Sequence, residues 1–359
     1  MGLRDEILEQ PEAARRQLAS SPDVLDAIAA RLRVEPVDSV VIAARGTSDH
    51  AAIYAQYLLG VRNELSVGLA TPSILSLYGA EPRVGRSLVI GISQSGASPD
   101  VVGVLESARR QGAPTLAITN APDSPLGSTA DYVVDLAAGP EEAIAATKTY
   151  TTSLLAIARL SLALDGSLDA APDADGAADA DADALGRIPD AIAAALEVEP
   201  AVAALARELV AGPGSMNGCV IVGRGFEYAT AREWALKLKE LGRIFADPYS
   251  SADFRHGPIA LVQPGVPVFV LAPAGKAAAG QLELLHDLRD RGVDTVVASD
   301  VAATRALGRW SISIPADVPE WLRPVVSIIP AQLLAYHLTV ARGLDPDAPR
   351  YIRKVTRTL

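Results

Sequence analysis

Hydroxyl side chains gather where the chain leaves a predicted apolar strand. Ser93, Gln94 and Ser95 follow this strand, Ser98 stands where it could cap the next helix, and Pro99 suits that helix's first position. Hydroxyls and backbone N–H groups at a helix N-terminus bind phosphate without needing net positive charge. The alternative interpretation is a hydroxyl-rich capping turn that binds no ligand.

A second cluster of small and hydroxyl residues ends an earlier predicted strand. Gly46, Thr47 and Ser48 directly follow the apolar segment 39–44. Strand ends at the carboxyl edge of a doubly wound sheet point into one crevice. The two clusters together therefore favour a single anion site.

Charged residues share one face of a predicted helix further along the chain. Glu233 lies four residues before Lys237, and Glu240 lies three residues after it. The arrangement is typical of a surface salt-bridge ladder. It also fits a carboxylate base beside an ammonium group, which is the arrangement that proton transfer needs.

His256 and Lys354 are two further residues that could take part in chemistry. His256 lies in a turn-rich segment, 250–258, just before Gly-Pro, and histidine is the usual proton shuttle near neutral pH. Only five of the 32 basic residues are lysines, and lysine, unlike arginine, can lose its proton. Lys354 is one of them, on a tail whose apolar residues could dock it. His50 opens a helix and fits either a structural or a functional role.

The elements that must position these residues alternate between strand and helix. This alternation predicts an α/β protein with parallel sheets covered by helices on both faces. The pattern also repeats, because 40–52 aligns with 219–231 and 108–120 aligns with 288–300 at almost the same offset. The second copy has lost the hydroxyls, which predicts that only the first copy binds the small anion. The predicted strands are 39–44, 87–92, 115–118, 219–222, 266–271 and 295–298.

The composition excludes several classes of protein. The net charge of −11, without a long basic run, argues against nucleic acid or an anionic membrane as a partner. No predicted transmembrane segment or signal peptide appears, and the single Cys219 excludes a disulfide framework. We therefore expect a cytoplasmic protein. The sequence lacks a P-loop motif, a complete dinucleotide fingerprint and histidine pairs with metal-ligand spacing, so no metal or other cofactor is expected.

The chain resembles the sugar isomerase (SIS) family, specifically the isomerase half of glucosamine-6-phosphate synthase and the related SIS-type deaminases. The matching motifs run nearly end to end: EQP (9–11), ARGTSDH (44–50), SQSGASPD (93–100), AATKTY (145–150), ALKLKE (235–240), SSADFRHGP (250–258) and KVTRTL (354–359). Arg45, where the synthase has Cys, favours the deaminase branch, as do SPD and the KVTRTL ending. The implied organisation is N-terminal helices at 1–33, SIS domains at 34–165 and 196–340, a linker at 166–195 and a closing tail at 341–359.

The resemblance also implies a role for individual residues. Glu240 would move the proton between C1 and C2, with Lys237 supporting it. His256 would assist ring opening from the partner subunit of a homodimer with shared active sites, and Lys354 would close over the sugar. The phosphate would be held by Thr47, Ser93, Gln94, Ser95 and Ser98, and the sugar by Gly46, Ser48, Ala146 and Lys148. Ala146 replaces a serine of the synthase that touches the sugar, and Asp253 replaces a glutamate.

The implied reaction converts glucosamine 6-phosphate to fructose 6-phosphate and ammonia. The synthase reaction itself is not expected, because it requires a glutaminase with an N-terminal cysteine and residue 2 is glycine. Dehydration of N-acetylglucosamine 6-phosphate, deglycation of a sugar-amine phosphate and sugar-phosphate sensing remain alternatives. The sequence leaves the sugar epimer, the acetylation state and the reaction direction open.

Overall fold

The computed structural model describes residues 2–166, 177–212, 216–263 and 265–354. The chain divides into two compact units that are each built from separate segments. Unit 1 comprises Met1–Pro11, Glu142–Thr147 and Ile188–Ile352. Unit 2 comprises Glu12–Glu141, Lys148–Arg187 and Arg353–Leu359.

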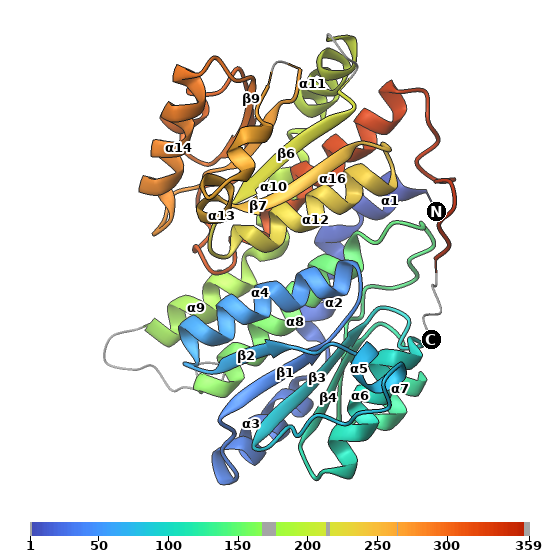
Figure 1. Ribbon diagram of the computed structural model, residues 1–359. Coiled ribbons are helices and arrows are strands. Elements are labelled where there is room, and N and C mark those ends of the chain that lie inside the picture. The colour runs from blue at the N-terminus through green and yellow to red at the C-terminus, as the bar shows by residue number, and fades with distance from the viewer. Residues whose placement is uncertain (1, 167–176, 213–215, 264, 355–359) are drawn as a thin grey trace. The chain divides into compact units, whose positions relative to one another are not determined.

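Unit 2 is built on a parallel five-stranded sheet in the order β2-β1-β3-β4-β5. Helices α5, α6 and α7 lie beside its strands in Figure 1, and α3, α4 and α8 form a second helical layer. The strands are β1 (Ser39–Ala43), β2 (Ser66–Leu69), β3 (Ser87–Ser93), β4 (Thr115–Thr119) and β5 (Tyr132–Asp135). The helices are α3 (Pro22–Val34), α4 (Thr47–Arg62), α5 (Ser73–Ser76), α6 (Pro99–Arg110), α7 (Pro125–Thr129), α8 (Lys148–Asp165) and α9 (Ala177–Gly186); α2 (Gln10–Ala19) begins in unit 1 and continues into unit 2.

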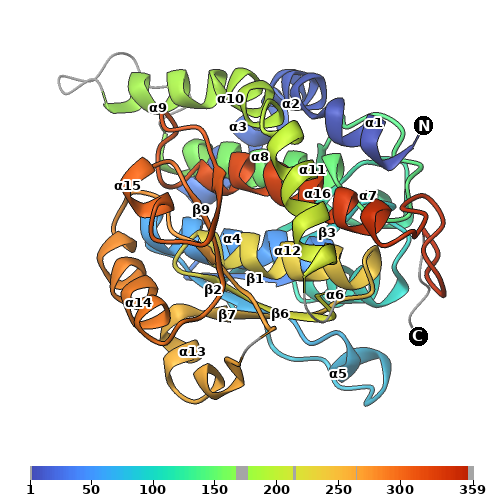
Figure 2. The ribbon, with the colours of Figure 1, turned by 90° about the horizontal axis from the view of Figure 1, so that it is seen from above.

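Unit 1 repeats this plan with a parallel sheet in the order β10-β9-β8-β6-β7. Figures 1 and 2 both show α13 and α14 on one side of this sheet and α11 and α16 on the other. The strands are β6 (Gly218–Gly223), β7 (Phe245–Ser250), β8 (Val268–Leu271), β9 (Thr295–Ser299) and β10 (Trp310–Ser313). The helices are α1 (Leu3–Leu8), α10 (Ile188–Leu196), α11 (Glu199–Ala211), α12 (Glu227–Glu240), α13 (Ser251–Arg255), the 3-10 helix η1 (Pro258–Leu261), α14 (Ala278–Asp290), α15 (Ala302–Arg305) and α16 (Arg323–Ala341).

The two sheets confirm the predicted α/β class and the internal repeat. Strand β1 begins at Ser39 and β6 at Gly218, and β4 begins at Thr115 and β9 at Thr295. Each pair starts at equivalent positions of the two copies, as the sequence alignment requires. Read from β7, the second sheet has the same order of strands as the first. Both copies are therefore doubly wound sheets of the flavodoxin-like order.

The sequence predicted the six inner strands and missed the four edge strands. The inner strands are almost wholly buried, so they appear as continuous apolar segments. Strands β2, β5, β7 and β10 are partly exposed along their length and carry polar residues or proline. They lack the continuous apolar pattern because each is an edge strand that pairs with another strand on one side only.

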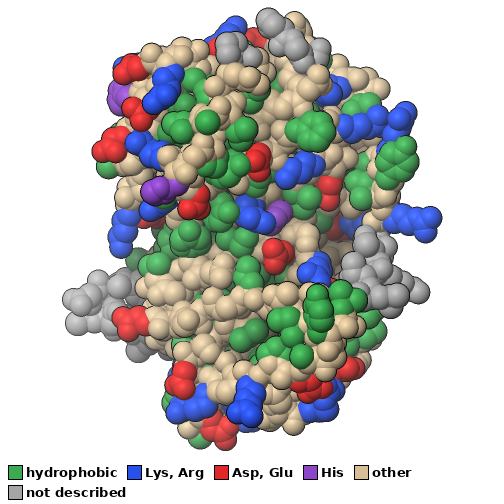
Figure 3. Space-filling model, in the orientation of Figure 1, with side chains coloured by type: hydrophobic (Ala, Val, Ile, Leu, Met, Phe, Trp, Pro, Cys, Tyr) green, Lys and Arg blue, Asp and Glu red, His purple; other side chains and the backbone are tan. Residues whose placement is uncertain are grey.

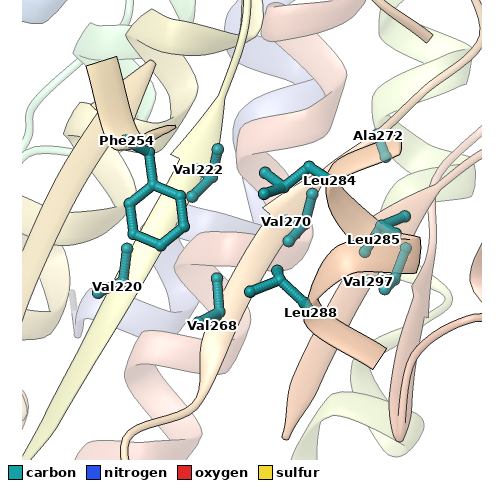
Figure 4. Close-up of a cluster of buried hydrophobic side chains, with 10 residues drawn as sticks. All are labelled: Val220, Val222, Phe254, Val268, Val270, Ala272, Leu284, Leu285, Leu288 and Val297. Carbon is teal, nitrogen blue, oxygen red and sulfur yellow. The ribbon is translucent and has the colours of Figure 1, made fainter. Parts of the chain in front are cut away.

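The core of unit 1 shows how the second copy holds its helices. In Figure 4, valines of β6, β8 and β9 face three leucines of α14, and Phe254 of α13 packs beside Val220 and Val222. Phe254 is fully buried. Its burial anchors the short segment that carries His256.

Two further features bear on the predicted boundaries. The predicted linker 166–195 lies partly outside the described residues, at 167–176, and its second part is helical as α9 and most of α10. Helix α16 is long and apolar enough to cross a membrane by length and composition, with a mean hydropathy of 1.4, and 78% of that window is buried. Such burial is the pattern of a core helix.

Candidate functional site

The hydroxyl clusters of unit 2 lie at the point where the strand order of its sheet reverses. Strand β1 has β2 on one side and β3 on the other. The carboxyl ends of β1 and β3 lead into Gly46-Thr47-Ser48 and into the loop 93–98, respectively. Ligands of doubly wound sheets bind in the crevice beside such strand ends. The structure thus brings the two predicted clusters to one edge of the sheet.

The loop that follows β3 is held by its own hydrogen bonds. The backbone N–H of Gly96 donates to both the carbonyl oxygen and the hydroxyl of Ser93, each at 3.2 Å, and the Ala97 N–H donates to the Ser95 hydroxyl at 3.3 Å. Gly96 has a φ of +60°, and a Cβ there would lie 1.8 Å from the hydroxyl of Ser124. Only glycine fits this position, so the turn is fixed.

Ser98 occupies the predicted N-cap position of α6, but its side chain makes no capping hydrogen bond. The cap residue is extended and Pro99 is the first helical residue, as the sequence predicts. Among the described residues the Ser98 hydroxyl has no hydrogen-bond partner. Ser98 is thus the N-cap residue by position, as the sequence predicts, while its hydroxyl is not used as a cap and is available to a ligand.

An ion pair that the sequence analysis did not identify lies at the same edge. The Nε of Arg45 donates to Oδ2 of Asp100 at 2.7 Å, and the Asp100 side chain is only 1% exposed. The first residue follows β1 and the second lies in the first turn of α6. The two residues are far apart in the chain, so their spacing gave no signal. The pair forms only because the two strands are neighbours.

Lys354 is docked on unit 2 by a buried carboxylate. Its Nζ donates to Oε2 of Glu141 at 2.8 Å. The same carboxylate accepts hydrogen bonds from the backbone N–H of Thr149 at 3.1 Å and from its hydroxyl at 2.8 Å. Glu141 thereby joins the N-terminus of α8, whose first residue is the buried Lys148, to the lysine of the tail.

Two of the three charged residues predicted to share a face of α12, Glu233 and Lys237, are buried in unit 1. Lys237 is 1% exposed and Glu233 is 0% exposed, with Nζ 3.2 Å from Oε1 of Glu233 and 2.7 Å from Oε2 of Glu240. Burial lowers the pKa of Lys237, but the two carboxylates outweigh it and the net shift is upward. The surface-ladder interpretation is wrong, because a charged lysine here is enclosed between two carboxylates. Glu240, 23% exposed, is the member of the triad that a ligand can reach.

His256 lies at the end of α13 in unit 1. Its backbone N–H donates to the carbonyl of Asp253 at 3.1 Å, and the Asp253 side chain accepts from the Ser250 hydroxyl at 2.9 Å. The imidazole is exposed and makes no hydrogen bond to a described residue. It is therefore free to act on a molecule outside its own segment.

The corresponding loop of the second copy is closed by a side chain. The backbone N–H of Lys276, after β8, donates to Oε1 of Glu320 at 3.0 Å. Gly275 has a φ of +137°, and a Cβ there would lie 2.6 Å from the carboxyl carbon of Glu320. The cavity beside it, lined also by Arg224 and Pro273, measures about 10 Å³, the space of one water.

The predicted site residues are thus distributed over both units. Unit 2 holds Gly46, Thr47, Ser48, Ser93, Gln94, Ser95, Ser98, Lys148 and Lys354, and unit 1 holds Ala146, Lys237, Glu240 and His256. Within the described ranges, no group of three or more His, Cys, Asp or Glu side chains could hold a metal ion. Cys219 is buried, which raises the pKa of its thiol.

Fold and loop together define a tandem, doubly wound α/β protein with a hydroxyl-lined loop at the switch point of its first copy. A family model described as "SIS domain" matches residues 35–163 and 217–342. The chain therefore belongs to the SIS domain family, as the sequence motifs indicated.

Individual relatives agree with this assignment. The chain is 35% identical over 354 residues to the glutamine–fructose-6-phosphate aminotransferase (isomerizing) of Methanothermobacter thermautotrophicus, covering 97% of this chain and 56% of that protein. It therefore spans about half the length of the curated relatives it matches. The C-terminal domain of glucosamine-fructose-6-phosphate aminotransferase from Francisella tularensis superimposes with a TM-score of 0.85 at 29% identity, covering 96% of each chain. A glucosamine-6-phosphate deaminase from Thermotoga maritima shares the fold, with a TM-score of 0.73 at 20% identity and 99% coverage of both chains.

Proposed function

We propose that the chain is an amino-sugar phosphate deaminase and isomerase that converts glucosamine 6-phosphate and water to fructose 6-phosphate and ammonia. The observation that carries the proposal is the rigid loop 93–98 at the switch point of unit 2. Relatives at up to 35% identity are named as isomerizing aminotransferases of fructose 6-phosphate, which supports the substrate class.

The proposed phosphate site uses hydroxyls and backbone N–H groups. Ser93, Ser95 and Ser98 surround the start of α6, and Thr47 is the first residue of α4. A phosphate in this loop would be favoured by the positive end of the helix dipole. The equivalent loop of the second copy is occupied by the carboxylate of Glu320, which supports a single phosphate site per chain.

The proposed proton transfer uses Glu240. In the open-chain aldehyde, the carboxylate removes the proton at C2, and the C–H electrons form the C1–C2 double bond of an enolamine whose O1 gains a proton. Protonation of C1, with loss of an N–H proton, gives the ketimine, and water then replaces the nitrogen as ammonia. Lys237 orients the carboxylate of Glu240, because its ammonium donates a hydrogen bond to Oε2 at 2.7 Å.

His256 and Lys354 are assigned to the remaining steps of the same proposal. The exposed imidazole of His256 would carry the proton from O1 to O5 that opens the sugar ring. Lys354, held by Glu141, would contact the sugar from the tail. Neither assignment requires a metal or redox cofactor.

We further propose a cytoplasmic homodimer with shared active sites and no nucleic-acid or membrane partner. Exposed apolar side chains on and just after α5, among them Leu77 at 68% and Tyr78 at 80%, support association with another subunit. On the face drawn in Figure 3, acidic and basic side chains are interspersed. Together with the net charge of −11, this supports a small-molecule ligand held by a local site.

The experiment is to measure turnover of glucosamine 6-phosphate by the Glu240→Gln variant together with exchange of the C2 proton in deuterated water. Loss of a general base lowers turnover by about 10²–10⁴-fold while phosphate affinity is unchanged. Glu283→Gln, an exposed glutamate of α14, is the matched control and should behave as the parent protein. Normal turnover and exchange in folded Glu240→Gln would remove Glu240 from the mechanism.

The same assay separates the alternative reactions. Ammonia and ketose phosphate are measured together for a panel of amino-sugar phosphates. Deamination releases both products in equal amounts, whereas dehydration of the N-acetylated sugar releases neither ammonia nor ketose phosphate. Deglycation releases the substituent amine in place of ammonia.

A further inference from the structure

The ion pair between Arg45 and Asp100 joins the two strand ends that flank the proposed phosphate site. Arg45 follows β1 directly before Gly46 and Thr47, and Asp100 lies two residues after Ser98. The hydrogen bond from Nε of Arg45 to Oδ2 of Asp100 has a donor–acceptor distance of 2.7 Å. The guanidinium is therefore fixed at the switch point, between the two hydroxyl clusters.

Asp100 is a rigid anchor for this guanidinium. Its side chain is 1% exposed, and its second oxygen accepts a hydrogen bond from the backbone N–H of Val101 at 2.9 Å. Each carboxylate oxygen thus has a fixed partner. A buried carboxylate without a countercharge would be costly and would also repel an anion nearby.

The guanidinium retains donors that the anchor does not use. Arginine has five N–H donors in a planar fork, and only the Nε donor of Arg45 is bonded to a described residue. The side chain is 47% exposed, so the terminal nitrogens are open to a ligand. Planar, pre-oriented N–H pairs match the oxygens of phosphate, and such charge-assisted bonds are about twice as strong as neutral ones.

We propose that Arg45 binds the phosphate group of the substrate, with Asp100 holding its guanidinium in place. The inference rests on the proposed function, since it concerns the same strand-end site. Without Arg45, hydroxyls and backbone N–H groups alone would hold the doubly charged phosphate group, with no positively charged side chain. Arg45 supplies that charge in a chain whose net charge of −11 otherwise opposes an anionic ligand.

If Arg45 has a purely structural role, a different result is expected, so a second variant is needed to separate the two roles. If Arg45 only neutralises the buried carboxylate, removal of that carboxylate should make Arg45 dispensable. Asp100→Asn removes the charge and keeps an oxygen for the Val101 N–H. The informative comparison is therefore Asp100→Asn with the double variant Arg45→Met/Asp100→Asn.

The chain offers a matched control at the opposite edge of the same two strands. Arg86 precedes β3 and Asp38 precedes β1, with 3.7 Å between Nε and Oδ2 and side chains 65% and 70% exposed. Arg86→Met makes the same change of charge away from the strand-end loops. It should leave ligand affinity unchanged.

The experiment is calorimetric titration of the full chain with fructose 6-phosphate and with inorganic phosphate, at low and high salt. We expect Arg45→Met to lower the affinity for both ligands by roughly tenfold to a hundredfold. This is the range that loss of a charge-assisted hydrogen bond covers. The double variant should bind both ligands more weakly than Asp100→Asn by the same factor. The salt dependence of binding should fall in both cases.

Four outcomes contradict the inference or locate the fault elsewhere. Equal affinity of Asp100→Asn and the double variant would reduce Arg45 to a structural countercharge. If Arg86→Met lowers the ligand affinity as much as Arg45→Met does, the inference is also overturned, because the change in net charge alone would then explain the loss. If the parent protein binds neither ligand, the proposed function fails as well. If it binds both and only Ser93→Ala/Ser95→Ala abolishes binding, the fault lies with Arg45 alone.

Discussion

Replacement of Lys237 by methionine tests the buried charge triad of α12. The substitution keeps the length of the side chain and removes its charge. Its Nζ lies 3.2 Å from Glu233 and 2.7 Å from Glu240. At an effective dielectric constant of about 20, each contact is an attraction of about 5–6 kcal/mol before the cost of desolvation.

The net effect is smaller but still large. Removal of one partner from a buried pair leaves an uncompensated charge and costs about 3–5 kcal/mol. Glu233, 0% exposed, is the buried carboxylate that would lose its ammonium partner. Since whole domains are stable by about 5–15 kcal/mol, Lys237→Met should lower the urea midpoint of unit 1 markedly.

Tryptophan fluorescence reports this unfolding selectively. The three tryptophans, Trp234, Trp310 and Trp321, all belong to unit 1. The control is Lys239→Met, the same substitution at an exposed position of the same helix, which should change stability by less than about 0.5 kcal/mol.

A double variant separates stability from catalysis. In Glu233→Gln/Lys237→Met the buried carboxylate is gone, so most of the lost stability should return, whereas activity should stay low because Glu240 still lacks its ammonium. A Lys237→Met protein as stable as the Lys239→Met control would refute the burial argument. Failure of the double variant to recover would show that charge was not the cause.

The pH dependence of this effect has a definite sign. The pKa of Lys237 is raised on folding, because the two carboxylates outweigh the effect of burial. A raised lysine pKa stabilises the fold fully below the unfolded value of about 10.4 and loses this contribution only as the pH rises through the folded value. Titration of Lys237 should therefore leave stability unchanged near neutral pH and reduce it only in strongly alkaline solution.

Three other experiments test the remaining parts of the site. Gly96→Ala places a methyl group 1.8 Å from a neighbouring hydroxyl at a φ of +60°, so it should distort the loop and abolish hexose 6-phosphate binding in calorimetry; unchanged affinity would contradict the fixed turn. Glu141→Gln removes the charge that holds Lys354, so kcat should fall as in Lys354→Met while phosphate affinity is kept; a normal kcat would make the contact incidental. Mixed Glu240→Gln and His256→Ala subunits should regain part of the activity if sites are shared, and no recovery after verified subunit exchange would exclude the shared site.

The limits of the sequence prediction are clearest in the strands. Continuous apolar segments identified β1, β3, β4, β6, β8 and β9, because buried parallel strands need apolar residues on both faces. The four edge strands carry no such pattern, and their pairing with an inner strand is a non-local event. Local periodicity could not find them.

The charged residues of α12 show the same limit of local sequence patterns. The spacing of Glu233, Lys237 and Glu240 placed them on one helical face, but it could not tell a solvated face from a buried one. Burial of that face depends on the packing of α12 against β6, β7 and α16, which tertiary structure alone determines. The surface interpretation failed for this reason.

By itself, the sequence determined the α/β class, the duplicated copy and the hydroxyl loop at the end of an inner strand, because these follow from local patterns and short motifs. Only the tertiary structure determined the pairs Arg45–Asp100 and Glu141–Lys354 and the closure of the second loop by Glu320. Each joins residues that are at least 44 positions apart in the chain. The physical reason is that strand order brings such residues together, and strand order is a property of the whole sheet.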